Sequence, residues 1–409
     1  MMDNFDMAAE KRKVLITGAG CICNAGPDVP SCTAALYSGD FPRPAPPDDF
    51  MPGFEQDFPV FACKKYLHAH YRDEKNVFIS SSFALQAALE ALRNAGVDPG
   101  ELSRSRTGIC MGTTVGASLN ILDFYKAWKE GGHPDLEQIY RYMRSNPALF
   151  LQEKFGLSGP VQTTTNACSS GTDAIGIGMQ WIRQGICDRV IAGGTDELNE
   201  LAYNGFIRLM NCSNEPCRPF DKERKGLNLG EGAGILILES EKSAEKRGAG
   251  ILGEVAGYSS AADAHHLTAP HPEARGLEIA FSRALKQAGI GPKDIGVINV
   301  HGTGTRANDQ AEASLLSRFP EQVPFFGSKG MTGHTLGAAG GMEAIFTLYC
   351  LREKRIPFTA GFSTPDPELG VAPAKGETEL SSPWAVSQSL AFGGNNSVLV
   401  LKGEEQPCT

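Results

Sequence analysis

One cysteine in this chain lies where its side chain could act as a nucleophile. Cys168 follows the β-rich run Val161–Asn166 and precedes the small residues Ser169, Ser170 and Gly171. This order predicts a strand that ends in a turn, with Cys168 at the start of the helix that follows. Because a helix N-terminus carries about half a positive charge and unpaired N–H groups, the position favours a thiolate.

Two of the eight histidines are candidates for partners of that thiol. His301 closes a β-rich run and opens the loop His301-Gly302-Thr303-Gly304-Thr305. His334 lies in a second glycine-rich loop, five residues after Lys329. Most histidines have structural roles, but two that both occupy glycine-rich loops between a predicted strand and a predicted helix are typical of a catalytic site.

Strands and helices that could position these residues alternate along the chain. Continuous apolar strands between helices predict an α/β protein whose sheets are covered on both faces. The predicted strands are Val14–Gly20 (which runs into a glycine turn), Thr107–Gly112, Val161–Asn166, Arg189–Thr195, Gly234–Ser240, Ile251–Ser260, Val297–Gly302, Phe325–Lys329, Val386–Phe392 and Val398–Lys402. The predicted helices are Ser80–Ala95, Ser169–Gln184, Pro272–Ala288, Asp309–Phe319 and Leu336–Arg355.

An internal repeat relates the segment that begins at Cys168 to the one that begins at His334. Their sequences superimpose with Gly171 on Gly337, and the first turns of both predicted helices are almost entirely Gly, Ala or Ser. Glycine inside a helix costs about 0.5–1 kcal/mol relative to alanine, so such helices must be buried against other backbone. We therefore predict two related halves, residues 1–250 and 251–409, with both helix mouths facing one site.

The composition excludes several function classes. Hydrophobic residues make up 41% and charged residues 21% of the 409 residues, as in ordinary globular proteins. A net charge of −9 argues against nucleic acid as a partner, and no apolar run could span a membrane. The eleven cysteines show no metal-ligand spacing. With no signal peptide, they indicate reduced thiols in the cytoplasm and predict no metal site.

The segments around Cys168, His301 and His334 resemble the three signatures of the β-ketoacyl-acyl carrier protein synthases, the elongating condensing enzymes of the thiolase superfamily. The resemblance extends from Val14 to Lys402. It implies a five-layer α/β/α/β/α thiolase-like fold and a decarboxylative Claisen condensation with malonyl-acyl carrier protein, in fatty acid or polyketide elongation. The three named residues would form the catalytic set, and no cofactor is implied.

Supporting residues follow from the same resemblance. Lys329 and Glu343 match the family's lysine loop and helix glutamate, and Phe392 matches its gating phenylalanine. The N–H groups of Cys168 and Phe392 would form the oxyanion hole, while Thr303 and Thr305 would line the malonyl position. Asp309, at the start of a helix, is interpreted as a structural partner. Val115 is expected to bound the acyl pocket.

The resemblance also implies partners. An acyl carrier protein must deliver the acyl and malonyl groups. Because such carriers are acidic, the segment that contains Lys64, Lys65 and Arg72 is the predicted docking surface. The chain is expected to form a homodimer, or a heterodimer with a ketosynthase-like chain-length partner in which this chain is the active subunit.

Two other function classes have partial support in the sequence. Residues 14–20, VLITGAG, resemble the opening of a nucleotide-binding fold, but Ile22 stands where the dehydrogenase motif requires glycine. The Tyr-x-x-x-Lys pairs Tyr71…Lys75 and Tyr125…Lys129 are too common to support an NAD(P)-dependent oxidoreductase. A non-catalytic chain-length subunit would lack the nucleophile, which is present here.

Overall fold

The computed structural model describes residues 12–47, 57–68, 78–114, 121–144, 146–319 and 323–404. Within them, one large sheet has the strand order β3-β2-β4-β5-β1-β6-β12-β11-β7-β8. Its strands are β1 (Val14–Ile22), β2 (Thr107–Gly112), β3 (Val161–Thr164), β4 (Arg189–Asp196), β5 (Gly232–Ser240), β6 (Gly253–Ala262), β7 (Ile295–Asn299), β8 (Phe325–Phe326), β11 (Trp384–Ala391) and β12 (Asn395–Lys402). A separate pair joins β9 (Arg355–Ile356) to β10 (Thr378–Glu379).

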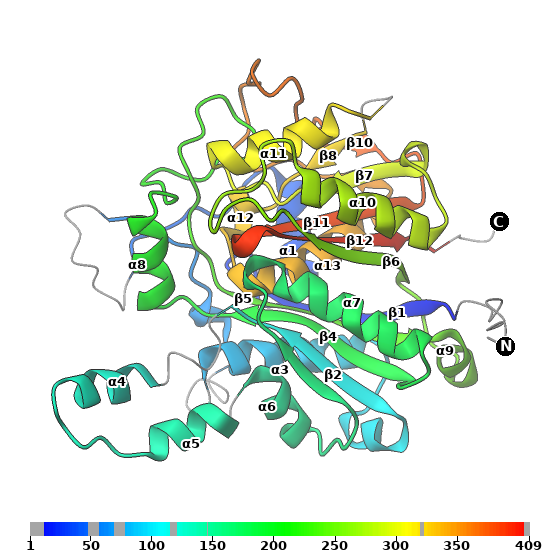
Figure 1. The fold of residues 1–409 in the computed structure, drawn as a ribbon. Helices are drawn as coiled ribbons and strands as arrows, with labels where there is room; N and C mark the ends of the chain where they lie inside the picture. The colour runs from blue at the N-terminus through cyan, green and yellow to red at the C-terminus, as the bar shows by residue number, and fades with distance from the viewer. Residues whose placement is uncertain are drawn as a thin grey trace, which may run out of the picture.

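The sheet consists of two halves that meet at one narrow contact. Strands β1 and β6 pair only at Leu15 with Glu254 and at Ile16 with Gly253. Helices α7 (Ser170–Arg183) and α13 (Ala339–Glu353) pack against each other, α7 on β2 and β4 and α13 on β5 and β11. Outside them, α3 (Ile79–Asn94) covers β1 and β5, and α10 (Arg275–Ala288) covers β6 and β12 (Figure 1). The layers are therefore α/β/α/β/α, as the family resemblance implied.

Glycines allow the two central helices to approach each other and the sheet. A Cβ atom on Gly171 would lie 2.7 Å from the carbonyl oxygen of Gly337, and one on Gly340 would lie 2.4 Å from the backbone nitrogen of Thr172. These distances are shorter than any carbon contact allows, so a larger residue would force the helices apart.

The repeat that the sequence predicts is present, but its register is wrong. A residue with positive φ begins each motif, Ala167 at 49° and Leu336 at 54°. Each is the first residue of a short 3₁₀ helix, Ala167–Ser169 or Leu336–Ala338, which leads into α7 or α13. The structural equivalent of Cys168 is therefore Gly337, three residues after His334. Both segments carry small residues at nearly every position, so they still match after a shift of three.

Several predicted boundaries also differ from the structure, each for a local reason. The glycine turn predicted at the end of Val14–Gly20 does not form, because Gly18 and Gly20 lie inside β1. These glycines let α3 pack closely on the strand, since a Cβ on Gly20 would lie 1.9 Å from the carbonyl oxygen of Ala87. Strand β7 ends at Asn299 because the side-chain carboxylate of Glu312 accepts the N–H of His301 in the next loop.

Strand β8 stops at Phe326 because the N–H of Gly327 bonds to the Thr359 hydroxyl at 3.1 Å. Lys329, predicted to end that strand, instead begins helix α12 (Lys329–Thr332).

Several helices were not predicted. They are α1 (Val29–Ser38), α4 (Leu122–Lys129), α5 (Glu137–Arg144), α6 (Pro147–Lys154), α8 (Glu200–Arg208) and α9 (Glu241–Arg247), whereas α11 (Arg306–Leu316) begins earlier than expected. Helices α4 and α5 extend away from the body (Figure 1) and expose large apolar side chains, Tyr125, Trp128, Tyr140 and Met143. Among the described residues, no helix combines the length and the apolar character needed to cross a membrane.

Candidate active site

A strained turn places Cys168 at the mouth of α7. Ala167 has a positive φ of 49°, which a residue with a Cβ adopts only when surrounding contacts hold it. Those contacts are present, because the hydroxyls of Ser170 and Thr114 donate to the carbonyl oxygen of Ala167 at 2.6 and 3.1 Å. The turn directs the thiol away from the strand and toward the second half of the molecule.

His334 meets Cys168 there, although 166 residues separate them along the chain. Its Nε2 lies 3.1 Å from the Cys168 Sγ. The backbone of His334 is fixed on both sides, since its N–H donates to the Asn228 carbonyl at 2.7 Å and its carbonyl accepts from the Gly230 N–H at 3.0 Å. The geometry can pass a proton between sulfur and imidazole.

His301 stands beside His334, with the two ring centroids 5.2 Å apart and the planes at 86°. Behind it, Lys329 Nζ lies 3.2 Å from His301 Nδ1 and donates to the His301 carbonyl at 2.6 Å. Lys329 also forms a buried ion pair with Glu343. The structure thus joins Lys329 and Glu343 to His301.

Glu312 holds the His301 loop and was not identified from the sequence. One carboxylate oxygen accepts the N–H of His301 at 2.6 Å and the side-chain amide of Gln388 at 2.7 Å. The other accepts the N–H of Gly302 at 2.7 Å and the side-chain amide of Asn308 at 2.8 Å. Burial raises the Glu312 pKa, and the hydrogen bonds from Gly302, Gln388 and His301 oppose that rise only in part. A glutamate between Ala311 and Ala313 on a helix gave no signal in sequence.

The protonation state of the Cys168 thiol differs from the thiolate that its place at a helix N-terminus suggests. Burial raises the Cys168 pKa to about 12, and the nearby charge of Lys329 and the Phe392 N–H only partly oppose this. The helix mouth therefore does not by itself produce a thiolate. Burial, followed by the charge of Lys329, also lowers the His334 pKa well below its ordinary value. The pair rests as a neutral thiol next to a neutral imidazole.

A small cavity of about 70 Å³ opens in front of Cys168 and both histidines. Thr303 and Thr305 line it, with their hydroxyls 2.9 Å apart. Phe392 closes one side, and its ring stacks on Phe206 at 5.1 Å. Phe206, which the sequence analysis missed, also meets His334 edge-on with ring centroids 6.1 Å apart.

Asp196 is a second residue that the sequence did not reveal, and it ties the two helix mouths together. This buried carboxylate accepts the N–H of Gly337 at 2.6 Å, the N–H of Thr114 at 2.8 Å and the hydroxyl of Thr113 at 2.7 Å. It thereby fixes the loop beside Cys168 to the equivalent turn of the other half.

The remaining predicted residues have mixed outcomes. Val115 and Arg72 lie outside the described residues. Lys64 and Lys65 form a short 3₁₀ helix away from the cavity, and Lys65 is exposed. Asp309 is fully buried in the first turn of α11, where it accepts the N–H groups of Phe220 at 2.8 Å and Gly304 at 3.2 Å and faces Arg224 at 3.8 Å. It does not line the cavity.

Comparison with known families and relatives gives consistent matches. The family described as "Beta-ketoacyl synthase, N-terminal domain" matches residues 11–244, and "Beta-ketoacyl synthase, C-terminal domain" matches residues 252–363. A 3-oxoacyl-[acyl-carrier-protein] synthase 2 from Staphylococcus aureus is 32% identical, with 96% of this chain and 99% of the relative covered. One from Synechocystis is 33% identical over 96% of this chain and 98% of the relative.

Solved structures give the same result. The ishigamide ketosynthase/chain length factor aligns with a TM-score of 0.87 and 31% identity, covering 97% of this chain and 100% of that one. A ketosynthase (ApeO) in complex with its chain length factor (ApeC) from Xenorhabdus doucetiae aligns with a TM-score of 0.81 and 29% identity, covering 99% and 100%.

Proposed function

This chain belongs to the β-ketoacyl synthase family, and we propose that Cys168 carries the acyl group while His301 and His334 activate a malonyl thioester. The enzyme is an elongating ketosynthase that joins an enzyme-bound acyl group to malonyl-acyl carrier protein, giving β-ketoacyl carrier and CO₂. The observation that supports these roles most directly is the 3.1 Å approach of Cys168 Sγ to His334 Nε2 in a cavity that His301 also lines.

In the first half-reaction, the Cys168 sulfur attacks the acyl thioester carbonyl and its proton passes to His334. The negative charge on the carbonyl oxygen is stabilised by the N–H groups of Cys168 and Phe392. The carbon–sulfur bond to the carrier then breaks, and the carrier thiolate takes up the proton. Because the thiol rests in its neutral form, the imidazole partner is necessary for this step.

In the second half-reaction, malonyl carrier occupies the cavity and its thioester carbonyl accepts hydrogen bonds from the Nε2–H groups of His301 and His334. Because His334 Nε2 accepted the thiol proton in the first half-reaction, the neutral His334 ring changes tautomer between the two half-reactions. The bond to the carboxylate breaks, CO₂ leaves, and the electron pair forms an enolate that the two donors stabilise. The enolate carbon attacks the acyl carbonyl on Cys168. The carbon–sulfur bond breaks, which frees the β-ketoacyl carrier and regenerates the thiol after protonation.

Lys329 gives His301 the tautomer that this step requires. An ammonium group can only donate, so its 3.2 Å contact makes His301 Nδ1 an acceptor and leaves the proton on Nε2. That N–H lies on the opposite side of the ring from the lysine. Burial, the charge of Lys329 and the neighbouring His334 keep the His301 pKa well below its ordinary value, so the ring stays neutral.

We expect Lys329→Met to lower malonyl decarboxylation by about 10²–10³-fold, the usual cost of losing one oxyanion donor. Removal of the cation also raises the His301 pKa, because a nearby positive charge disfavours the imidazolium. The acid limb of the pH–rate profile therefore moves upward. Measurement of CO₂ release between about pH 5 and 8 checks both effects. Lys329→Arg, which keeps the charge, is the control, and an unshifted profile in Lys329→Met contradicts the assignment.

Acyl and malonyl groups reach the cavity on a carrier protein, and we propose that Lys64 and Lys65 form part of its docking surface. The carboxylate of Glu231 fixes their segment, accepting the N–H groups of Cys63 at 2.8 Å and Lys64 at 3.1 Å. The strand-like contact of Phe61 with Gly230 joins this segment to the loop that holds His334. The segment that carries the two lysines is therefore linked by backbone hydrogen bonds to the loop around His334.

Reversal of both charges, Lys64→Glu with Lys65→Glu, should raise the KM for acyl carrier at least about twofold, since exposed ion pairs contribute roughly 0.2–1 kcal/mol each. The salt dependence of KM should flatten as well. The matched control is Lys242→Glu with Lys246→Glu, an equal charge change on exposed lysines after the far end of β5. Equal KM values in both double variants would exclude the patch.

A specific observation favours a second arrangement, in which this chain is the active subunit of a heterodimer with a chain-length partner. The two similar structures named above are ketosynthases with chain length factors. The exposed aromatic side chains of α4 and α5, such as Trp128, would suit a subunit interface. The mass of the purified assembly, with and without a co-expressed ketosynthase-like chain that lacks the nucleophile, distinguishes this arrangement from a homodimer.

We also propose the division into halves at residue 250, which the narrow pairing between β1 and β6 and the two family matches support.

A cytoplasmic location is proposed as well. Ten cysteines among the described residues are free thiols, which agrees with a reducing compartment.

A further inference from the structure

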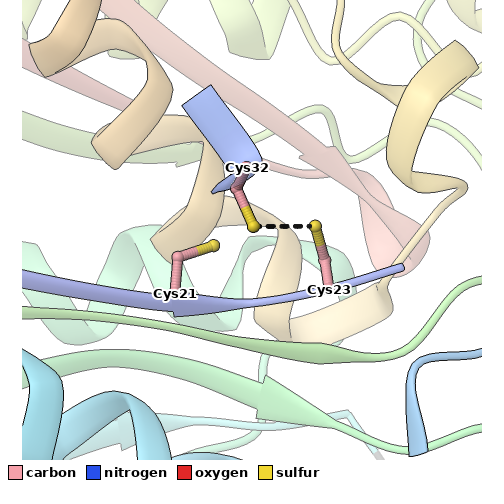
Figure 2. Close-up of side chains that lie close together, drawn as sticks. All are labelled: Cys21, Cys23 and Cys32. Atoms are coloured by element: carbon pink, nitrogen blue, oxygen red, sulfur yellow. Dashed lines mark hydrogen bonds between the residues drawn. The ribbon is translucent and has the colours of Figure 1, made fainter. Parts of the chain in front are cut away.

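Three thiols that the catalytic mechanism does not use converge at one point in the core. The sulfur atoms of Cys21, Cys23 and Cys32 all lie within 4.8 Å of one another, and those of Cys23 and Cys32 are 3.5 Å apart (Figure 2). All three side chains are fully buried. These cysteines have no metal-ligand spacing along the chain, so the sequence alone predicts no metal site.

The fold brings them together in two steps. Cys21 and Cys23 are separated by one residue at the end of β1, so their side chains point to the same face. The chain then reverses in a tight turn, in which Cys23 and Gly26 exchange backbone hydrogen bonds of 3.0 and 3.1 Å. Helix α1 starts directly after this turn and packs on β1, which places Cys32 above the other two thiols (Figure 2).

The spacing fits a metal ion at the centre of the triangle. A thiolate–metal bond of about 2.3 Å in trigonal geometry separates the sulfur atoms by roughly 4.0 Å. The Cys23–Cys32 separation of 3.5 Å is below that value and the other two separations are at most 4.8 Å, so small side-chain adjustments suffice. Within the described residues, no carboxylate or imidazole joins the group. The neighbouring Glu90 is already engaged, since its two oxygens accept the N–H groups of Cys21 and Val29, each at 2.8 Å.

We propose that Cys21, Cys23 and Cys32 bind one copper(I) ion in a three-coordinate thiolate site. Soft thiolate ligands select copper(I), whereas zinc in proteins usually takes a fourth protein ligand or an open position for water, and among the described residues this fully buried position has no fourth ligand and no exposed side. Binding forms three sulfur–copper bonds and releases the protons that the thiols carried, with no change in oxidation state. Because Cys168 is not part of the group, the proposal is independent of the proposed function.

The test uses the full chain with the background substitution Cys168→Ala, which removes the catalytic thiol as a competing ligand. After prolonged anaerobic incubation with copper(I), native mass spectrometry counts the bound ions and X-ray absorption counts their sulfur neighbours. We expect one copper ion per chain with three sulfur neighbours. In Cys23→Ala or Cys32→Ala, we expect copper affinity to fall by more than the about 10–100-fold that loss of an outer-shell partner causes.

Cys110→Ala is the matched control, because Cys110 is equally buried but outside the group; it should bind copper like the background protein. Circular dichroism confirms that each variant is folded. Failure of the background protein to bind copper, or equal binding in Cys23→Ala, overturns the proposal. A parallel incubation with zinc(II) tests the choice of metal, since tighter binding of zinc than of copper(I) contradicts a three-coordinate copper site.

Discussion

Cys168→Ala is expected to abolish acyl loading, with no adduct visible in the intact mass after incubation with acyl carrier thioesters. The thiol is the nucleophile of the first half-reaction, and alanine has no atom that can form the thioester. No other cysteine can replace it, because among the described cysteines only Cys168 lines the cavity and contacts His334. The substitution removes a single sulfur atom at a site with 4% exposure, so the fold should persist.

The same variant should still release CO₂ from malonyl carrier, because the two imidazole donors are unchanged. This separates loss of the nucleophile from a general loss of structure. Cys350→Ala, a substitution of the same size at a buried cysteine in α13, is the control for packing effects and should load normally. An acyl adduct that survives in Cys168→Ala would show that the acyl group binds elsewhere.

The α/β class and most of the elements could be predicted from the sequence, because buried strands and small-residue helices leave strong local patterns. Strand Thr107–Gly112 has the predicted bounds. The patterns do not reveal which backbone groups bond to side chains. Strand β7 was predicted to continue to Gly302, but Glu312 takes the N–H groups of His301 and Gly302 and ends it at Asn299. A contact between a loop and the next helix has no signature along the chain.

The candidate catalytic set came from three short motifs and a family resemblance, and the structure places its members in one cavity. The sequence could not show the electrostatic balance there. A helix mouth suggests a thiolate, yet the desolvation of Cys168 is the larger effect and raises its pKa to about 12. Burial depends on packing between the two halves, which spacing in the sequence does not report.

The two histidines are expected to differ when each is replaced by alanine. Both substitutions should lower CO₂ release from malonyl carrier by about 10²–10³-fold, or roughly 2.7–4 kcal/mol, because each removes one donor to the enolate oxygen. The rate of acyl loading onto Cys168 distinguishes the two variants. His334→Ala should also slow loading, since His334 Nε2 is the group within 3.1 Å of the Cys168 thiol. His301→Ala should load at close to the normal rate, because the ring contacts of His301 are with Lys329 and His334.

Burst-phase loading, followed by intact mass, and CO₂ release, measured on the same preparations, give the two rates. The pH dependence offers an additional check with a defined sign. The Cys168 thiol rests protonated, so loading in His334→Ala should recover as pH rises, when hydroxide replaces the imidazole as proton acceptor. Loading in the unmodified chain should change much less over the same range. Equal loading in both histidine variants, or CO₂ release that survives in either, would remove the proposed division of roles between His301 and His334.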